Sequence, residues 1–267
     1  MNITFQKKSG DGSPGIQFFW RMEIRTRSPI AIIDHFIPEL FFDYFFIQRG
    51  RIKCINKALG REYRLPRQVL KTIHTRPLLF TYSTPLVLFG ARFSLKFAES
   101  LWLEDPPSNS FLEQRWISKP LKDLNSFAEQ VTGHVQTHQA RKWPYPMLSP
   151  ALKESDWLVH FSPRHKRRLY IATFGLSRKE LQGVRNVHAF LEQTCDFASQ
   201  NPRIIQHIDP EVFYDQPHLN HTFKKMTGFS PVEYFQANSI LQDQLMSASY
   251  NEISNSRHTI AAERSNP

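Results

Sequence analysis

The alternation of apolar and polar positions divides the chain into a first half typical of strands and a second half typical of helices. From residue 30 to 97, short apolar, aromatic and β-branched runs are separated by glycines and prolines, which favours an antiparallel sheet or small barrel. Residues 121–139 have the pattern of one or two amphipathic helices, and a helical, basic region follows position 147. We therefore predict an α+β fold in which a β-rich N-terminal domain precedes an all-α C-terminal domain.

Two proline-containing breaks set the expected domain boundaries. One is Asp105-Pro106-Pro107, and the other is Trp143-Pro144-Tyr145-Pro146. Residues 1–28, rich in Gly, Ser and scattered charge, are expected to be loosely held. The expected organisation is a flexible arm over 1–28, a β-rich domain over 29–118, a helical connector over 119–146, a helical domain over 147–246 and a polar tail over 247–267.

The charge of the chain narrows the class of partner. Lys and Arg number 34 against 24 Asp and Glu, a formal net charge of +10, which favours nucleic acid or an anionic membrane surface. No apolar run is long enough to span a membrane, and the N-terminus lacks the apolar core of a signal peptide. Cys54 and Cys195 are too few for a disulfide framework or a four-thiolate zinc site. We expect a cytoplasmic protein that has no membrane partner.

An internal repeat is the most specific feature of the sequence, because residues 161–181 can be laid over 214–234. Each copy opens with an aromatic residue and a helix N-cap, runs about eleven residues as helix, and then reaches a glycine suited to a left-handed helix end. A serine and a glutamate three positions later form a capping box that starts a second helix. The paired positions are Ser162 and Asp215, Gly175 and Gly228, Ser177 and Ser230, and Glu180 and Glu233.

Side chains on the first helix of each copy suit contact with DNA. Residues 164–168 comprise three arginines, a lysine and a histidine, and the second copy offers amides, histidines and lysines. Arg pairs bidentately with guanine, Asn and Gln pair with adenine, and Lys binds phosphate. Neither 164–168 nor 217–221 contains an acidic residue, whereas a merely solvated helix normally mixes in acids. The capping signals alone also fit two helical hairpins without functional meaning. The basic and amide side chains of the two helices favour DNA binding instead.

The second copy resembles the signature of the AraC/XylS family of transcription regulators. The resemblance is carried by Phe213-Tyr214-Asp215-Gln216-Pro217-His218-Leu219, by Phe223-Lys224 and by Thr227-Gly228-Phe229-Ser230-Pro231. It implies a DNA-binding domain over 147–246, with two helix-turn-helix units joined by a helix near 178–196 and a recognition helix from each in successive major grooves. Residues 34–39 through 90–93 resemble a cupin-type sensory domain, which implies a small-molecule effector or homodimerisation, with 121–139 as a candidate dimer contact.

The same resemblance implies which residues meet double-stranded DNA. They are Arg164, His165, Arg167 and Arg168 in the first unit, and Gln216, Pro217, Asn220 and His221 in the second, with Lys224 and Lys225 nearer the phosphates. The sequence departs from the family pattern at Lys166, Ile208, Pro210, Val212 and His221. Whether both units bind DNA therefore stays open at this point.

Histidines, a cysteine and clustered aromatic residues suggest other functions. His134 and His138 have a metal-chelating spacing without a third ligand, and His35 and His74 lack the clustered acids of a catalytic cupin. We therefore predict no metal, no cofactor and no enzymatic activity, with a metal-dependent cupin enzyme or a nonspecific nucleic-acid binder as alternatives. Arg51 and Lys53 would lower the pKa of Cys54 and allow redox sensing.

The aromatic residues of the first half either line a ligand pocket or fill a core, and core packing is favoured. These residues are Phe36, Phe41 to Phe46, Phe80, Tyr82, Phe89 and Phe93.

Overall fold

The structure is a computed structural model that describes residues 1–10, 15–56, 60–100, 108–138, 160–194, 216–230, 233–234 and 239–249. Its strands are β1 (Asn2–Ser9), β2 (Ile16–Arg25), β3 (Ala31–Phe36), β4 (Phe42–Asn56), β5 (Arg61–Arg64), β6 (Gln68–Lys71), β7 (Leu78–Phe93) and β8 (Phe111–Glu113). Its helices are α1 (Leu95–Ser100), α2 (Leu124–His138), α3 (Pro163–Phe174), α4 (Arg178–Thr194) and α5 (Gln216–Thr227), followed by a helix over residues 241–249.

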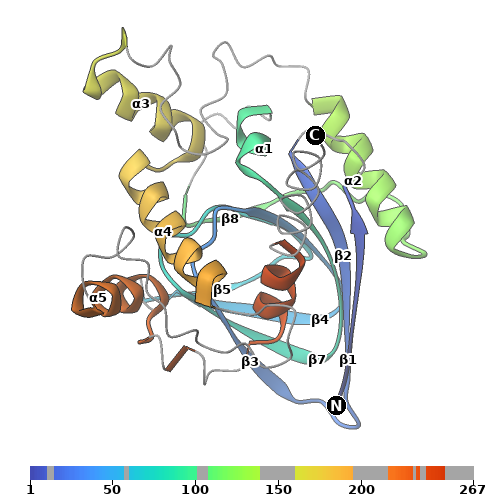
Figure 1. The fold of residues 1–267 in the computed structure, drawn as a ribbon. Coiled ribbons are helices and arrows are strands. Elements are labelled where there is room, and N and C mark those ends of the chain that lie inside the picture. Colours follow the sequence, from blue (N-terminus) through green and yellow to red (C-terminus); the bar gives the residue numbers. More distant parts are fainter. Residues whose placement is uncertain are drawn as a thin grey trace, which may run out of the picture.

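The strands form one antiparallel sheet in the order β1-β2-β7-β4-β6-β8, with β3 also paired to β7 and β5 to β4. Long, curved β4 and β7 are its centre (Figure 1). This confirms the predicted antiparallel sheet in the first half of the chain. After β8, the elements that the structure describes are helices, in keeping with the predicted order of a β-rich part and a helical part.

The expected flexible arm over 1–28 is wrong for β1 and β2. Asn2–Ser9 pairs along its whole length with β2, and β2 in turn pairs with β7. The physical reason is the period-two burial of β2, in which Phe18, Trp20, Met22 and Ile24 are all fully buried. Gly10 follows β1 directly and donates its N–H to the Gln17 carbonyl of β2 (3.0 Å), which continues the pairing of the two strands.

Aromatic side chains fill the sheet's interior, as the favoured interpretation expected. Phe36, Phe80 and Tyr82 are buried in one cluster that also takes in Leu241 and Leu245 from the C-terminal helix. The small hollow that Phe80, Tyr82 and Leu241 help to line has no room for a water molecule. Within the described ranges, this side of the sheet is therefore a packed core.

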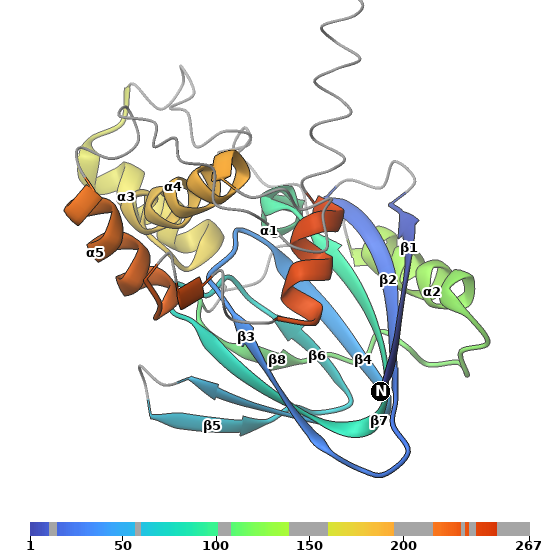
Figure 2. The same cartoon turned by 60° about the horizontal axis from the view of Figure 1, so that its bottom comes forward.

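The helix α2 covers the opposite side of the sheet. Its buried residues Phe127, Val131 and Val135 join the cluster that includes Phe19 and Phe89 (Figures 1 and 2). The apolar side of the candidate dimer contact is therefore used within the chain, and the side that remains exposed is polar. None of the described helices combines the length and the apolar character that crossing a bilayer requires.

The C-terminal helix over 241–249 attaches the helical half to the sheet. Asp34 of β3 accepts hydrogen bonds from the backbone N–H groups of Ile240 (3.0 Å) and Leu241 (2.8 Å) at the start of this helix. Near its end, the Ser249 hydroxyl accepts a bond from buried Arg92 of β7 (3.2 Å). The two halves of the molecule are thus joined by buried polar contacts as well as by apolar packing.

Candidate nucleic-acid interface

The helix α3 begins and ends where its capping residues predict. Ser162 precedes it in an extended conformation, and its side-chain oxygen accepts a bond from the His165 N–H (3.3 Å). Pro163 occupies the first turn, where its missing N–H costs least. At the other end, Gly175 has a φ of 70°, and its N–H donates to the Ile171 carbonyl (2.8 Å). A left-handed glycine therefore ends the helix, as expected.

The capping boxes of both copies are formed. In the first, the Ser177 N–H donates to Glu180 Oε2 (2.8 Å) and the Glu180 N–H donates to Ser177 Oγ (3.3 Å). In the second, the corresponding bonds between Ser230 and Glu233 measure 2.7 Å and 3.3 Å. The hydrogen bonds from Ser230 hold the pKa of Glu233 below its usual value. The repeat predicted from the sequence is thus a structural repeat.

The outward side of α3 carries the arginines. Arg164, Arg167 and Arg168 are exposed, and Ile171 and Ala172 continue the same stripe one turn further, with Ile171 44% exposed. This spacing of three and four positions places these side chains on one side of a helix. The opposite side is buried in the cluster shared with the sheet: Leu169, Tyr170 and Phe174. We call residues 164, 167, 168, 171 and 172 the α3 stripe.

Two neighbouring positions on α3 lie off the stripe. The His165 ring is half-buried and stacks on Phe161, with ring centroids 4.5 Å apart. Lys166, which stands where the resembled family carries an apolar residue, is also half-buried, beside the start of α4. The arginines therefore dominate what this helix presents to solvent, with His165 at its margin.

The helix α5 presents a comparable polar side. Asn220, His221, Lys224 and Lys225 are exposed at positions one turn apart, and Phe223 on the other side is fully buried against Phe190 of α4 (centroids 5.6 Å). Gln216 and Pro217 lie in the first turn of α5. Asp215, Ile208, Pro210, Val212 and Cys195 fall outside the described residues.

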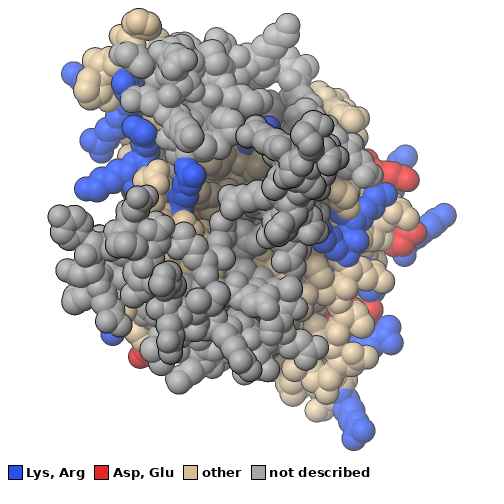
Figure 3. All heavy atoms as spheres, viewed as in Figure 1, with Lys and Arg blue, Asp and Glu red and all other residues tan. Residues whose placement is uncertain are grey.

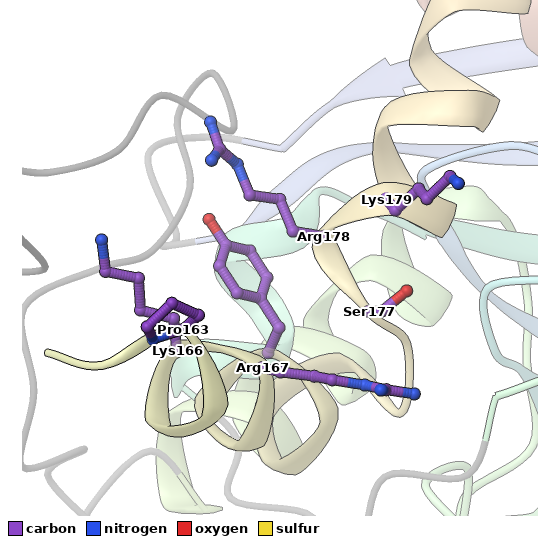
Figure 4. Close-up of a pocket in the computed structure, with 7 residues that line it drawn as sticks. Pro163, Lys166, Arg167, Ser177, Arg178 and Lys179 are labelled. Atoms are coloured by element: carbon purple, nitrogen blue, oxygen red, sulfur yellow. The ribbon is translucent and has the colours of Figure 1, made fainter.

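The arrangement brings the two helices onto the same part of the molecule. In Figure 1, α4 lies between α3 and α5, and both views place these three helices away from α2 (Figures 1 and 2). Figure 3 shows Lys and Arg side chains gathered over α3 and the start of α4. Figure 4 shows Arg178 and Lys179 with Lys166 and Arg167 around the hollow between α3 and the start of α4, which we call the cationic hollow. Sequence reasoning missed three members of this surface, Arg178, Lys179 and Ile171, because the first two were read only as the start of a helix and the third was given no role.

Residues considered for other chemistry do not assemble into a site. Among the described residues, no three His, Cys, Asp or Glu side chains gather as metal ligands would. His74 is buried, and this burial lowers its pKa to about 3, which keeps the ring neutral. Burial also raises the pKa of the Cys54 thiol to about 12, against the lowering expected from Arg51 and Lys53. Cys54 is therefore a thiol with little thiolate character.

Comparisons with known proteins find a weak likeness to a few solved structures. No family model matches the chain, and no curated protein matches it. Among solved structures, ToxT from Vibrio cholerae aligns at 11% identity over 79% of this chain and 98% of its own, with a TM-score of 0.39. The AraC-like transcriptional activator CuxR aligns at 10% identity over 91% of both chains, with a TM-score of 0.28. At such scores the likeness assigns no residue and no activity, and the site's own geometry has to carry the functional argument.

Proposed function

We propose that the chain is a sequence-specific DNA-binding transcription regulator of the AraC/XylS type, without enzymatic activity, whose α3 and α5 enter successive major grooves. The observation that carries the proposal is the exposure of matching sides on two similarly capped helices: Arg164, Arg167 and Arg168 on α3, and Asn220, His221, Lys224 and Lys225 on α5. Burial of either side against the protein's own body would have removed it from DNA. Instead, the apolar side of each helix is buried and the polar side faces solvent.

Base recognition follows from the chemistry of each exposed group. Arg164 and Arg168 suit bidentate bonds to guanine, and exposed Ile171 suits contact with a thymine methyl group. On α5, Asn220 suits bidentate bonds to adenine, and Lys224 and Lys225 near the helix end suit phosphates. His165, Gln216 and Pro217 complete the proposed set on the strength of the family resemblance.

The sheet is proposed to be the cupin-like regulatory domain, acting in the cytoplasm as an effector-binding or homodimerising unit. ToxT has been solved with an unsaturated fatty acid bound. In this chain, the hollow lined by Phe45, Tyr82 and Leu241 is filled by side chains. An effector of this site would therefore have to displace Leu241, which also starts the C-terminal helix. In the proposed regulation, effector binding therefore displaces the C-terminal helix.

A binding titration on the full chain tests the proposal. Its own upstream DNA and a random duplex of equal length are titrated with the wild-type protein and with Arg167→Ala, Asn220→Ala and the distant control Arg61→Ala on β5. Loss of one base contact is expected to cost about 1–3 kcal/mol on the upstream DNA only. Equal weakening on both duplexes would show that Arg167 and Asn220 touch phosphates alone. Absence of any preference by the wild type would leave a nonspecific nucleic-acid binder.

A further inference from the structure

The outer side of β3 is an open edge of the sheet. β3 pairs with β7 on one side, and within the described ranges no strand pairs with its other side (Figure 2). Alternate residues bond to β7, because Thr84 donates its N–H to the Ile30 carbonyl (3.1 Å) and Ile32 has the same phase in the ladder. The N–H and C=O groups of Ala31 and Ile33 therefore point away from β7, and both residues are exposed. We call residues 31–33 the β3 edge.

The β3 edge differs from the other edges of the sheet in its side chains. Charged side chains on an edge strand oppose pairing with a further strand. The other edge strands carry such charges, namely Lys7 and Lys8 on β1, Arg61 and Arg64 on β5, and Glu113 on the three-residue β8. On β3, by contrast, Asp34 is fully buried, while Ile33 is 57% exposed and Ile30, just before the strand, is 44% exposed. These are two of the four large apolar side chains that the described part of the chain exposes.

The β3 edge is complementary to itself. In an antiparallel pairing of two copies centred on Ile32, Ala31 of each copy lies opposite Ile33 of the other. Each such pair can exchange both of its backbone N–H···O=C bonds, so the outward groups of all four residues find partners. The side chains that meet on the outer face are then apolar on both sides, and no charge is brought against a like charge.

The residues that flank the β3 edge fit the same register. Pairing centred on Ile32 sets Pro29 of one copy opposite His35 of the other. Pro29 has no N–H to donate, and the His35 carbonyl that would face it already accepts a bond from the Ser239 hydroxyl (3.3 Å). The position that lacks a donor therefore meets an acceptor that is already satisfied. A foreign strand would have to match this arrangement by chance, whereas a second copy matches it by symmetry.

We infer that the β3 edge pairs with the β3 edge of a second copy of the chain, across a two-fold axis at Ile32, so that the two sheets join into one. The inference rests on the homodimerising role in the proposed function and names the contact. It also moves the contact away from the 121–139 segment, since the apolar side of α2 is buried within the chain. A two-fold dimer carries two copies of α3 and α5, which suits a DNA site with two related halves.

Sedimentation velocity of the full-length protein without DNA tests the pairing. The wild type should shift from one copy to two as its concentration rises. Ile33→Lys should raise the dissociation constant of the dimer at least about tenfold, because two apolar cross-strand pairs are lost and two ammonium groups enter the joined edge. Ile171→Lys is the matched control, an exposed isoleucine of α3 given the same charge, and it should keep the wild-type constant. A wild type that stays a single copy at every concentration, or equal weakening by both variants, would overturn the inference.

Cross-linking tests the register without relying on a loss of association. The Cα atoms of the two Ile32 residues would lie about 4.5 Å apart in this pairing, within the reach of a disulfide. Mild oxidation should therefore link Ile32→Cys into a covalent dimer, and should link neither the wild type nor Ile171→Cys, both of which keep the native cysteines. If Ile32→Cys is linked no more than these two controls, the pairing at Ile32 is refuted.

The DNA titration described above keeps this inference separate from the proposed function. A wild type that prefers its upstream DNA but stays a single copy would refute pairing through β3 and leave the regulator intact. A dimer that depends on Ile33, in a protein without preference among DNA sequences, would retain the pairing and refute the regulator. Dimers that form equally well in Ile33→Lys would show that another surface holds the two copies together.

Discussion

The two copies of the repeat, called here the first unit (161–181) and the second unit (214–234), share a capping box and a left-handed glycine but lie in different settings. The first unit packs its apolar side on the sheet through Tyr170 and Phe174, and leaves the polar ends of α3 and α4 open around a cationic hollow. The second unit rests the end of α5 and the following turn on the sheet domain itself. On the polar side of α5 the exposed groups are one amide, one imidazole and two amines, against three guanidinium groups on α3. The same capping box and left-handed glycine thus accompany two different kinds of surface.

Contacts at the end of α5 show how the second unit is held. Arg76, between β6 and β7, donates to the carbonyl of Lys225 (3.4 Å), and the rings of His35 and Phe229 meet edge to face at 5.0 Å. The structure describes no comparable bond between the sheet domain and the α3 stripe. Charge is therefore concentrated in the first unit, whose apolar side also packs on the sheet, whereas a hydrogen bond from the sheet domain goes directly to the end of α5 in the second. We expect a movement of the sheet near Arg76 to be transmitted directly to α5.

The Asp34 carboxylate accepts four hydrogen bonds at this connection, so its removal should have the largest effect on stability. Its fully buried carboxylate accepts bonds from the Tyr82 hydroxyl (2.8 Å), the Ser239 hydroxyl (2.6 Å) and the two N–H groups that begin the 241–249 helix. Asp34→Ala should destabilise the protein by at least about 3 kcal/mol, because each buried donor left without an acceptor costs about 1–3 kcal/mol. Denaturant unfolding measures the total loss.

Hydrogen exchange then locates the Asp34→Ala effect. The 241–249 helix and α5 should lose protection, while α3 should keep most of its own. Asp123→Ala is the matched control, since Asp123 also caps a helix by accepting from the Ser126 N–H (2.8 Å) but at an exposed position. Uniform loss of protection over α3 and α5 would contradict the assignment of the connection to the second unit.

The pH dependence of this connection is expected to come from Asp243, in the first turn of the same helix. Burial and the neighbouring Asp34 carboxylate raise the pKa of Asp243 from 3.8 to about 7, although an N–H bond from Ser239 opposes them. A raised pKa means that the docked helix favours the protonated acid. Docking should therefore weaken as the pH rises from about 4 to about 7 and level off above that range.

The difference between wild type and Asp243→Asn isolates this titration from that of other groups. Exchange protection of residues 241–249 is measured from acid to neutral pH in both proteins. The variant should lose most of the pH dependence, because its amide stays neutral throughout. A wild-type profile that is flat, or that gains protection as the pH rises, would show that Asp243 is solvated when the helix is docked.

Local chemistry explains which parts of this molecule could be predicted from sequence. The helix ends at Ser162, Gly175 and Ser177 depend on residues within four positions, so the local sequence is sufficient to predict them. The pairing of β2 with β7 joins parts of the chain that are distant in sequence, and the Lys- and Gly-rich hairpin of β1 and β2 concealed both strands. The hydrogen bonds between Asp34 and the 241–249 helix join residues more than 200 positions apart, and no sequence pattern predicts them.

The site was predictable in the same uneven way. The type of side chain at Arg164 to Arg168 pointed to DNA, and the structure exposes all three arginines. Which side of α3 faces outward was not determined by the run of five polar residues, so His165 was grouped with the arginines although it stacks on Phe161. The cationic hollow needs two helices brought together by the turn at Gly175, and a pattern within one helix cannot show it.

Truncating one arginine of α3 and one histidine of α5 compares how much each type of side chain contributes to DNA binding. Arg164→Ala on α3 should weaken binding to the upstream DNA by about 1–3 kcal/mol, because a bidentate contact to guanine is lost. His221→Ala on α5 should cost less, since one ring nitrogen forms a single bond. Competition assays on upstream DNA measure both. A larger loss for His221→Ala would mean that the second unit dominates recognition despite its smaller charge.

The smallest expected effect concerns the two capping boxes. The comparison is whether each serine stabilises the protein equally, although the two boxes have different surroundings. Ser177→Ala and Ser230→Ala each remove a hydroxyl that accepts from the N–H three residues on, at 3.3 Å in both boxes. Each should cost about 1 kcal/mol, and the glycine variants only a few tenths, because glycine at an N-cap leaves the N–H groups open to water. Thermal unfolding of the four variants gives the comparison. Since contacts with the sheet hold the turn at Phe229 in place independently of the cap, the Ser230→Ala loss should be the smaller of the two; a larger loss there would mean that the cap, and not the sheet, positions the second unit.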